Sequence, residues 1–203
     1  TLNQPVFNGD LNVQQGSFRD SSSGLRLEAL NLAGNFSNTR ATITTFNATD
    51  GEKGSVSGTG QIGLVEGSTS ALQLNLTSFK IIDNDIAKVH AGGRLRALRG
   101  QDGNIILSGG LNIEDAEISP NLPGSNGIVR MDVIEINRPG GDLVVDPKAR
   151  SKGPSIGLDL TLRGREINIR GRGLDVELSA NARVQGTLAA PQLTGTANVV
   201  RGD

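Results

Sequence analysis

The clearest pattern in the chain is a strict alternation of apolar and polar residues between Leu174 and Val184. Every even-numbered position in this run is apolar, and every odd-numbered position is polar or charged. Successive side chains of a strand point to opposite faces, so the run predicts one long strand with an apolar and a polar face. The alternation resumes from Leu193 to Val199 after Pro191, which lacks the N–H that a central ladder needs. We therefore predict an antiparallel hairpin that turns around Pro191.

A short motif, apolar-x-Gly-x-apolar, recurs along the chain with its glycine in step with the apolar residues. Its glycines are Gly9, Gly58, Gly93, Gly109, Gly186 and Gly195. Their spacing is uneven, whereas the rungs of a β-helix have similar lengths, so a meandering sheet fits better. Glycine inside a strand marks a bend or a close approach, and on the apolar side it would let a sheet curl around a groove. Twist points in a packed sandwich are the alternative interpretation.

Alternating runs elsewhere predict strands through most of the chain, including residues 72–76 and 156–162. Residues 79–89 carry apolar side chains at helical spacing, but Asp83-Asn84-Asp85 within them is equally typical of a hairpin turn. Apolar parity flips near Gly164 and near Gly171–Gly173, where we expect bulges.

The patterns predict an all-β fold built on an elongated, mostly antiparallel sheet, which either curls around a groove or closes into a packed sandwich. The turn-rich segments near residues 119–127 and 138–155 are interpreted as loops rather than domain boundaries. Residues 1–203 are therefore expected to form a single elongated β domain. Because the sequence begins without Met, we expect it to be a fragment of a larger protein.

Composition narrows the classes of protein that fit. The 203 residues include 28 Gly and only 2% aromatic residues, with no Trp, Tyr or Cys, so aliphatic side chains must form the core. The absence of Cys excludes disulfides and thiolate metal sites, and a net charge of -1 gives no reason to expect nucleic acid. No segment approaches the roughly 20 apolar residues of a membrane helix.

Candidate catalytic and metal-binding residues are sparse. The single histidine, His90, has no nucleophile or carboxylate close by in the sequence, so a surface position is favoured. Asp83 and Asp85 resemble part of a cation loop, but no following Gly and Glu complete it. Arginines at 163, 165, 170 and 172 could meet phosphate groups, although a solvated outer face is favoured. We expect no enzyme activity, no metal and no cofactor.

An amphipathic sheet must bury its apolar side, because that burial is the main stabilising term. Either two sheets close on each other, or one sheet folds into a groove. An open groove would suit acyl chains or unfolded apolar segments. Its predicted lining is Leu107, Leu111, Ile113, Leu158, Leu160, Leu162, Leu174, Val176, Leu178, Val184, Leu188, Leu193 and Val199.

Several segments resemble the C-terminal region of TamB proteins, which belong to the AsmA-like superfamily. They are Gly110–Ile118, Asp132–Asn137, Ile169–Leu178, Gln185–Leu188, Pro191, Thr194-Gly195 and Val200–Gly202. The resemblance is specific over about residues 105 to 203 and looser before them. No catalytic motif is carried over with it.

The resemblance implies an elongated, mostly antiparallel sheet curled into a taco-like trough with an apolar concave face. It places this trough in the Gram-negative periplasm, within a protein that is anchored in the inner membrane and reaches the outer membrane. It implies TamA, the outer-membrane barrel, as a partner, with outer-membrane proteins or autotransporters as clients. The implied roles are phospholipid transport between the membranes and assembly of outer-membrane proteins.

Three hypotheses follow for function. The first is a groove that binds the acyl chains of phospholipids. The second is a chaperone-like scaffold whose sheet edges pair with strands of outer-membrane proteins. The third is a closed structural sandwich that needs no ligand.

Overall fold

The computed structural model describes residues 6–21, 23–119, 155–171 and 174–202, and these residues form strands and turns with no helix. This confirms the all-β prediction. The strands are β1 (Gly9–Arg19), β2 (Arg26–Phe36), β3 (Arg40–Thr49), β4 (Ser55–Gly63), β5 (Ser70–Asp83), β6 (Ala87–Arg99), β7 (Ile105–Ile118), β8 (Ile156–Gly171), β9 (Leu174–Thr187) and β10 (Ala190–Gly202).

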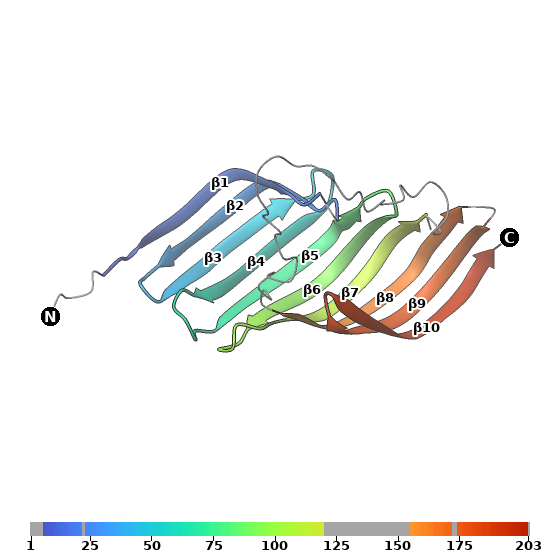
Figure 1. The fold of residues 1–203 in the computed structure, drawn as a ribbon. Coiled ribbons are helices and arrows are strands. Elements are labelled where there is room, and N and C mark those ends of the chain that lie inside the picture. The colour runs from blue at the N-terminus through green and yellow to red at the C-terminus, as the bar shows by residue number, and fades with distance from the viewer. Residues whose placement is uncertain (1–5, 22, 120–154, 172–173, 203) are drawn as a thin grey trace, which may run out of the picture. The chain divides into compact units, whose positions relative to one another are not determined.

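The ten strands form one sheet in chain order, from β1 to β10 (Figure 1). Each strand is antiparallel to the next, except that β7 and β8 are parallel. Within the described residues β1 and β10 have no pairing partner on their outer edges, so the sheet is open. The predicted loops near 119–127 and 138–155 and the segment Asp132–Asn137 fall almost entirely in residues 120–154, outside the described residues.

Strand register gathers the apolar residues onto one side of the sheet, the apolar face. Residues directly opposite each other on paired strands point to the same side. One such row crosses every strand: Val13, Leu32, Phe46, Gly58, Leu74, Leu95, Gly109, Leu160, Val184 and Leu193. The opposite side, the outer face, carries rows such as Asn75, Arg94, Gly110, Thr161, Arg183 and Thr194. The alternation in the sequence therefore becomes two chemically distinct faces.

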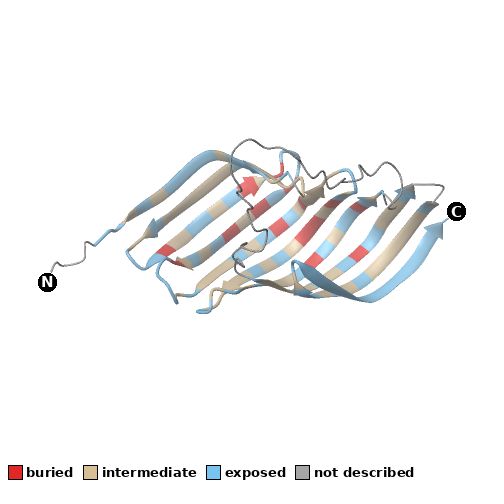
Figure 2. Ribbon diagram, viewed as in Figure 1, coloured by how far each residue is buried: buried red, intermediate tan, exposed pale blue. Residues whose placement is uncertain are grey.

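The sheet curls toward its apolar face. The backbone N–H of Asp83, at the end of β5, donates a hydrogen bond of 2.8 Å to the carbonyl of Ser23 in the β1–β2 turn. The core lies on the apolar face of the middle strands, shown in red in Figure 2, and β10 is exposed throughout. The buried cluster that forms this core consists of Ala48, Val56, Leu76, Phe79, Ala91 and Leu111. The curl thus buries the middle of a single-layer sheet.

Bulges keep the apolar residues on one face. Three non-glycine residues have positive φ: Gln15 (54°), Ala29 (48°) and Ser78 (44°). Each lies at a register shift between neighbouring strands, where one strand holds an extra residue. The shift at Ala29 explains how Leu27 and Leu30, which differ in parity, both pack against the core. The predicted bulge at Gly164 is also present, as a shift between Gly164 and Ile167.

The structure differs from one local prediction, decides a second between its alternatives and describes a third only in part. The turn of the last hairpin is Leu188-Ala189, and Pro191 lies within β10 opposite Gly186, so a turn around Pro191 was wrong. Proline is tolerated there because β10 is an edge strand. Residues 79–89 form the β5–β6 hairpin rather than a helix. The bulge expected at Gly171–Gly173 includes residues outside the described ones.

Candidate functional site

The residues predicted to line a groove come together on the apolar face. Register places Leu107 opposite Leu158, and Leu111 opposite Leu162. Further pairs on this face are Leu160 with Val184, Ile113 with Gly164, Ile169 with Val176, Val184 with Leu193, and Leu178 with Val199. Two predicted residues stand apart. Leu188 lies in the β9–β10 turn, and Leu174 begins β9 with its side chain outside the described residues.

Exposure divides the apolar face into two halves. The buried half, over β3–β7, contains Phe79 at 2% exposure and Ala91 at 0%. The open half, over β8–β10, includes Leu193 and Val199, each 69% exposed. One row passes from the first half to the second: Ala48, Val56, Leu76, Gly93, Leu111, Leu162, Ala182 and Gly195. The surface available to a ligand is therefore the open half.

The six predicted glycines also lie on the apolar face, and five of them are opposite a larger apolar residue. These pairs are Gly9 with Phe36, Gly58 with Phe46, Gly93 with Leu76, Gly109 with Leu95, and Gly186 with Leu158, while Gly195 faces Ala182. A Cβ added at Gly9 would lie 2.7 Å from the Phe36 ring. Most of these glycines thus leave room for a large side chain on the neighbouring strand.

The predicted lining omitted the apolar face of the N-terminal strands. Leu72, Leu74 and Leu76 on β5 and Phe46 on β3 belong to the same rows as the predicted residues. Their alternation was visible in the sequence, but no pattern within one strand shows which strands share a face. Gly34 and Gly60 occupy equivalent positions, opposite Ile43 on β3. The sequence did not give the pairing register of the strands, which decides which residues share a face.

The outer face is polar and carries exposed arginines. Arg163, Arg165 and Arg170 are exposed, while Arg172 is outside the described residues. Arg183 donates two hydrogen bonds to one carboxylate oxygen of Asp159, from Nε at 3.0 Å and Nη2 at 2.8 Å. Arg170 Nε lies 3.4 Å from Asp175 Oδ1. These are exposed ion pairs, which contribute little to stability.

His90 has carboxylate neighbours that the sequence did not predict. Its Nδ1 lies 3.9 Å from Asp115 on β7, and its Nε2 lies 4.0 Å from Glu52 in the β3–β4 turn. Both distances exceed a hydrogen bond. Within the described residues, no group of three or more His, Asp or Glu side chains could hold a metal ion.

A polar cluster joins the β3–β4 turn to β5. The buried carboxylate of Asp50 accepts hydrogen bonds from the backbone N–H groups of Glu52, Gly54 and Lys80, at 2.9 to 3.0 Å. Burial alone would raise the pKa of Asp50, but these N–H donors outweigh it and lower the pKa below its ordinary value. Lys80 Nζ bonds Glu52 at 2.6 Å and Asp83 at 3.2 Å, and its hydrogen bond to Glu52 is the main cause of its raised pKa. The cluster is structural, since its polar groups bond one another.

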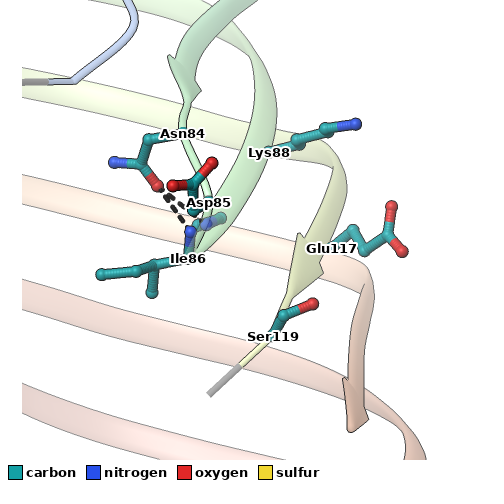
Figure 3. Close-up of a pocket in the computed structure, with 7 residues that line it drawn as sticks. Asn84, Asp85, Ile86, Lys88, Glu117 and Ser119 are labelled. Carbon is teal, nitrogen blue, oxygen red and sulfur yellow. Dashed lines mark hydrogen bonds between the residues drawn. The ribbon is translucent and has the colours of Figure 1, made fainter. Parts of the chain in front are cut away.

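A pocket of about 290 Å³ lies at the β5–β6 turn (Figure 3). The side-chain oxygen of Asn84 accepts hydrogen bonds there from the N–H groups of Ile86 and Ala87, at 3.0 and 2.9 Å. Lys88 and Glu117, opposite each other on β6 and β7, point to the same side in this view. The polar groups shape the turn and do not converge on a common point, so the apolar face remains the candidate site.

These features define the class of protein: an open, all-β trough whose distinctive surface is one side of its own sheet. The sequence model of the TamB C-terminal domain matches residues 44–203, and the chain belongs to this family. The match begins within β3, so β1 and β2 precede it. Neither the curated proteins nor the solved structures include a match.

Membership of the family sets the general role. TamB proteins are part of the translocation and assembly module of the Gram-negative envelope and work with TamA. The family is a transport and assembly family and not a known family of enzymes. A helix long and apolar enough to cross a membrane does not occur in the part of the chain that the structure describes.

Proposed function

We propose that the apolar face binds acyl chains of phospholipids that move between the inner and outer membranes. The observation that supports this most directly is the row from Val13 to Leu193, which crosses all ten strands without a polar side chain. An extended acyl chain that lies along such a row can contact apolar side chains over its whole length. In the open half it is accessible, since Leu193 and Val199 are each 69% exposed.

The energetics of burial favour a lipid tail as the ligand. Each CH₂ group that leaves water contributes about 0.8 kcal/mol, so a partly buried tail would be held firmly. The face is lined by aliphatic side chains and glycine, which provide no fixed polar contact. We therefore infer selectivity for acyl chains as a class and little discrimination between lipid species.

The wider setting belongs to the same proposal. Residues 1–203 would be a single domain of a periplasm-spanning protein with an inner-membrane anchor, and its partners would be phospholipids, TamA and outer-membrane protein clients. No cofactor is required, because transport along an apolar face needs no chemical step. The six glycines would curve the groove, as their close contacts with neighbouring strands support.

A scaffold that pairs its edge with client strands is the second candidate. It is favoured by β10, whose 13 residues are all exposed and whose outer edge has no partner among the described residues. An exposed edge presents unpaired N–H and C=O groups that template another strand. A client strand with alternating apolar and polar residues would continue both faces of the sheet.

Native mass spectrometry of the purified protein, with lipid extraction, tests the lipid proposal. Leu193→Glu places a charge on the apolar face at an exposed position, where the cost to folding is low. Its matched control is Thr194→Glu, the next residue of β10, whose side chain is also exposed but lies on the outer face. We expect bound phospholipid in the wild type and in Thr194→Glu, and its loss in Leu193→Glu.

Circular dichroism verifies that both variants keep the sheet. A wild type that carries no lipid and takes up none would contradict the proposal and favour the scaffold. Equal lipid retention by the two variants would place the lipid elsewhere.

A further inference from the structure

The β1–β2 turn contacts the end of β5, three strands away from β2 in the sheet. Asp83 N–H donates to Ser23 O at 2.8 Å, and Gly24 packs directly against the same residue. A Cβ added at Gly24 would lie 1.7 Å from the carbonyl oxygen of Asp83, and the φ of Gly24 is +75°. Only glycine fits this contact, because any side chain would strike backbone.

The turn that makes this contact is held together by its own hydrogen bonds. Asp20 N–H donates to Leu25 O, and Gly24 N–H donates to Asp20 O, both at 2.9 Å. Ser23 donates to the Asp20 carboxylate from its N–H at 2.8 Å and from its hydroxyl at 2.6 Å. The turn can therefore keep its shape when it leaves Asp83.

The residues that follow this contact in the chain cover part of the buried half of the apolar face. Leu25 and Leu27, which follow the turn, pack against the cluster that contains Phe79 and Ala91. Ala91 is 0% exposed although the sheet is a single layer. β1 lies at one edge of the sheet, and Leu25 and Leu27 precede the first pair of the β2–β3 ladder, so this end of the β1–β2 hairpin can open locally.

We propose that the contact of Ser23 and Gly24 with Asp83 is a releasable clasp. When it is closed, the buried half of the apolar face is filled by the protein's own leucines, and only the open half accepts a ligand. When it is released, the β1–β2 turn and the start of β2, which precede the ladder with β3, move away from the cluster, and the two halves form one continuous apolar surface. Only the identity of the ligand rests on the proposed function; the opening itself does not.

The test uses a thiol in a chain that contains no Cys. Ala91→Cys places a reporter in the buried half, and its rate of reaction with a maleimide measures how often that half opens. Gly24→Ala disrupts the clasp. Gly67→Ala is the matched control, since Gly67 has a similar φ of +72° in another turn but a Cβ there would meet nothing within 4 Å. Leu193→Cys in the open half verifies that the reagent is equally available.

We expect Ala91→Cys to react about tenfold faster in Gly24→Ala than in Gly67→Ala, with a rate that depends only weakly on urea, because local opening exposes less surface than global unfolding. Ala48→Cys, another buried position of the cluster, should respond in the same way. Equal rates in the two backgrounds would overturn the proposal. A faster rate with the steep urea dependence of global unfolding would overturn it too.

A second measurement compares the oxidised and reduced forms of one variant, so that the loss of the Ser23 hydroxyl and the Asp83 carboxylate is common to both forms. In a Ser23→Cys, Asp83→Cys double variant, a disulfide should slow amide hydrogen exchange in β2 by about tenfold relative to the reduced form. Unchanged exchange would contradict the clasp. Both experiments are done without lipid, so a failure of the lipid proposal would leave their outcome intact.

Discussion

Two glycines on the apolar face of β6 and β7 meet the backbone of the neighbouring strand. Gly93 and Gly109 have φ values of +143° and +142°, a region that L side chains rarely adopt. A Cβ at Gly93 would lie 2.2 Å from Gly110 O, and one at Gly109 would lie 2.2 Å from Arg94 O. The two contacts are reciprocal, since each glycine faces the backbone of the other's strand.

The neighbouring residue Gly110 provides a direct comparison. Gly109→Ala should lower the free energy of unfolding by roughly 2–4 kcal/mol, because it adds both backbone strain and a clash. Gly110→Ala should leave it unchanged or raise it by up to about 1 kcal/mol, since a Cβ there meets nothing within 4 Å. Urea unfolding followed by circular dichroism measures both. Equal losses in the two variants would contradict the assigned register.

This pair also shows what the sequence could and could not predict. The motif placed Gly109 on the apolar side, because it shares parity with Leu107 and Leu111. Nothing in the sequence distinguishes the backbone conformation of Gly109 from that of Gly110. The difference arises from the carbonyl of Arg94 on a neighbouring strand, and therefore requires the register.

Among the elements, the bulge in β5 and the β3–β4 turn depend on each other. Ser78 has a φ of 44° at the register shift between β5 and β6. Beyond Ser78, β5 continues past the β3–β4 turn as far as Asp83. A Cβ at Gly54 in the turn would lie 2.5 Å from Ser78 O. Asp50 fixes this arrangement, because its carboxylate accepts a hydrogen bond from the backbone N–H of Lys80 on β5.

The stability that Asp50 contributes should depend on pH. Its pKa is lowered in the folded state, so its contribution is complete above the ordinary value of 3.8 and is lost as the pH falls through the lower folded pKa. Asp50→Asn should therefore cost about 1–3 kcal/mol near neutral pH, because a buried N–H loses its acceptor. The gap to the wild type should narrow in acid. Urea unfolding at neutral and strongly acidic pH measures this difference.

Asp102 provides the control for that comparison. It also accepts hydrogen bonds, from the N–H and side chain of Asn104, but it lies in an exposed turn. Asp102→Asn should therefore destabilise the protein less than Asp50→Asn at neutral pH. If the cost of Asp50→Asn were the same at every pH, the carboxylate would not be the source of this stability.

Predictions for whole elements succeeded where the pattern was local. Alternation located β9 and the start of β8, and the parity change near Gly164 correctly indicated a bulge. Pro191 was misplaced because proline breaks a central strand but fits an edge strand, and the sequence does not show which strand is the edge. Position in the sheet, rather than propensity, decided that case.

At the scale of the molecule, exposure increases from the middle of the sheet toward β10. The same row that buries Ala48 to 3% exposure ends on β10 in exposed residues. The single-layer sheet buries its middle by curling. The contact between Ser23 and Asp83, which is a consequence of the curl, joins residues that are far apart in the chain. No periodicity predicts such a contact, so the sequence left a closed sandwich and a groove as alternatives.

Photo-cross-linking tests most directly whether lipid lies on the apolar face. A photoreactive amino acid replaces Val184, on the apolar face of β9, or Gln185, the next residue on the outer face. After incubation with phospholipid vesicles and irradiation, mass spectrometry counts the covalent lipid adducts. We expect adducts at Val184 and none above background at Gln185. Equal labelling at both positions, or labelling at Gln185 alone, would contradict it.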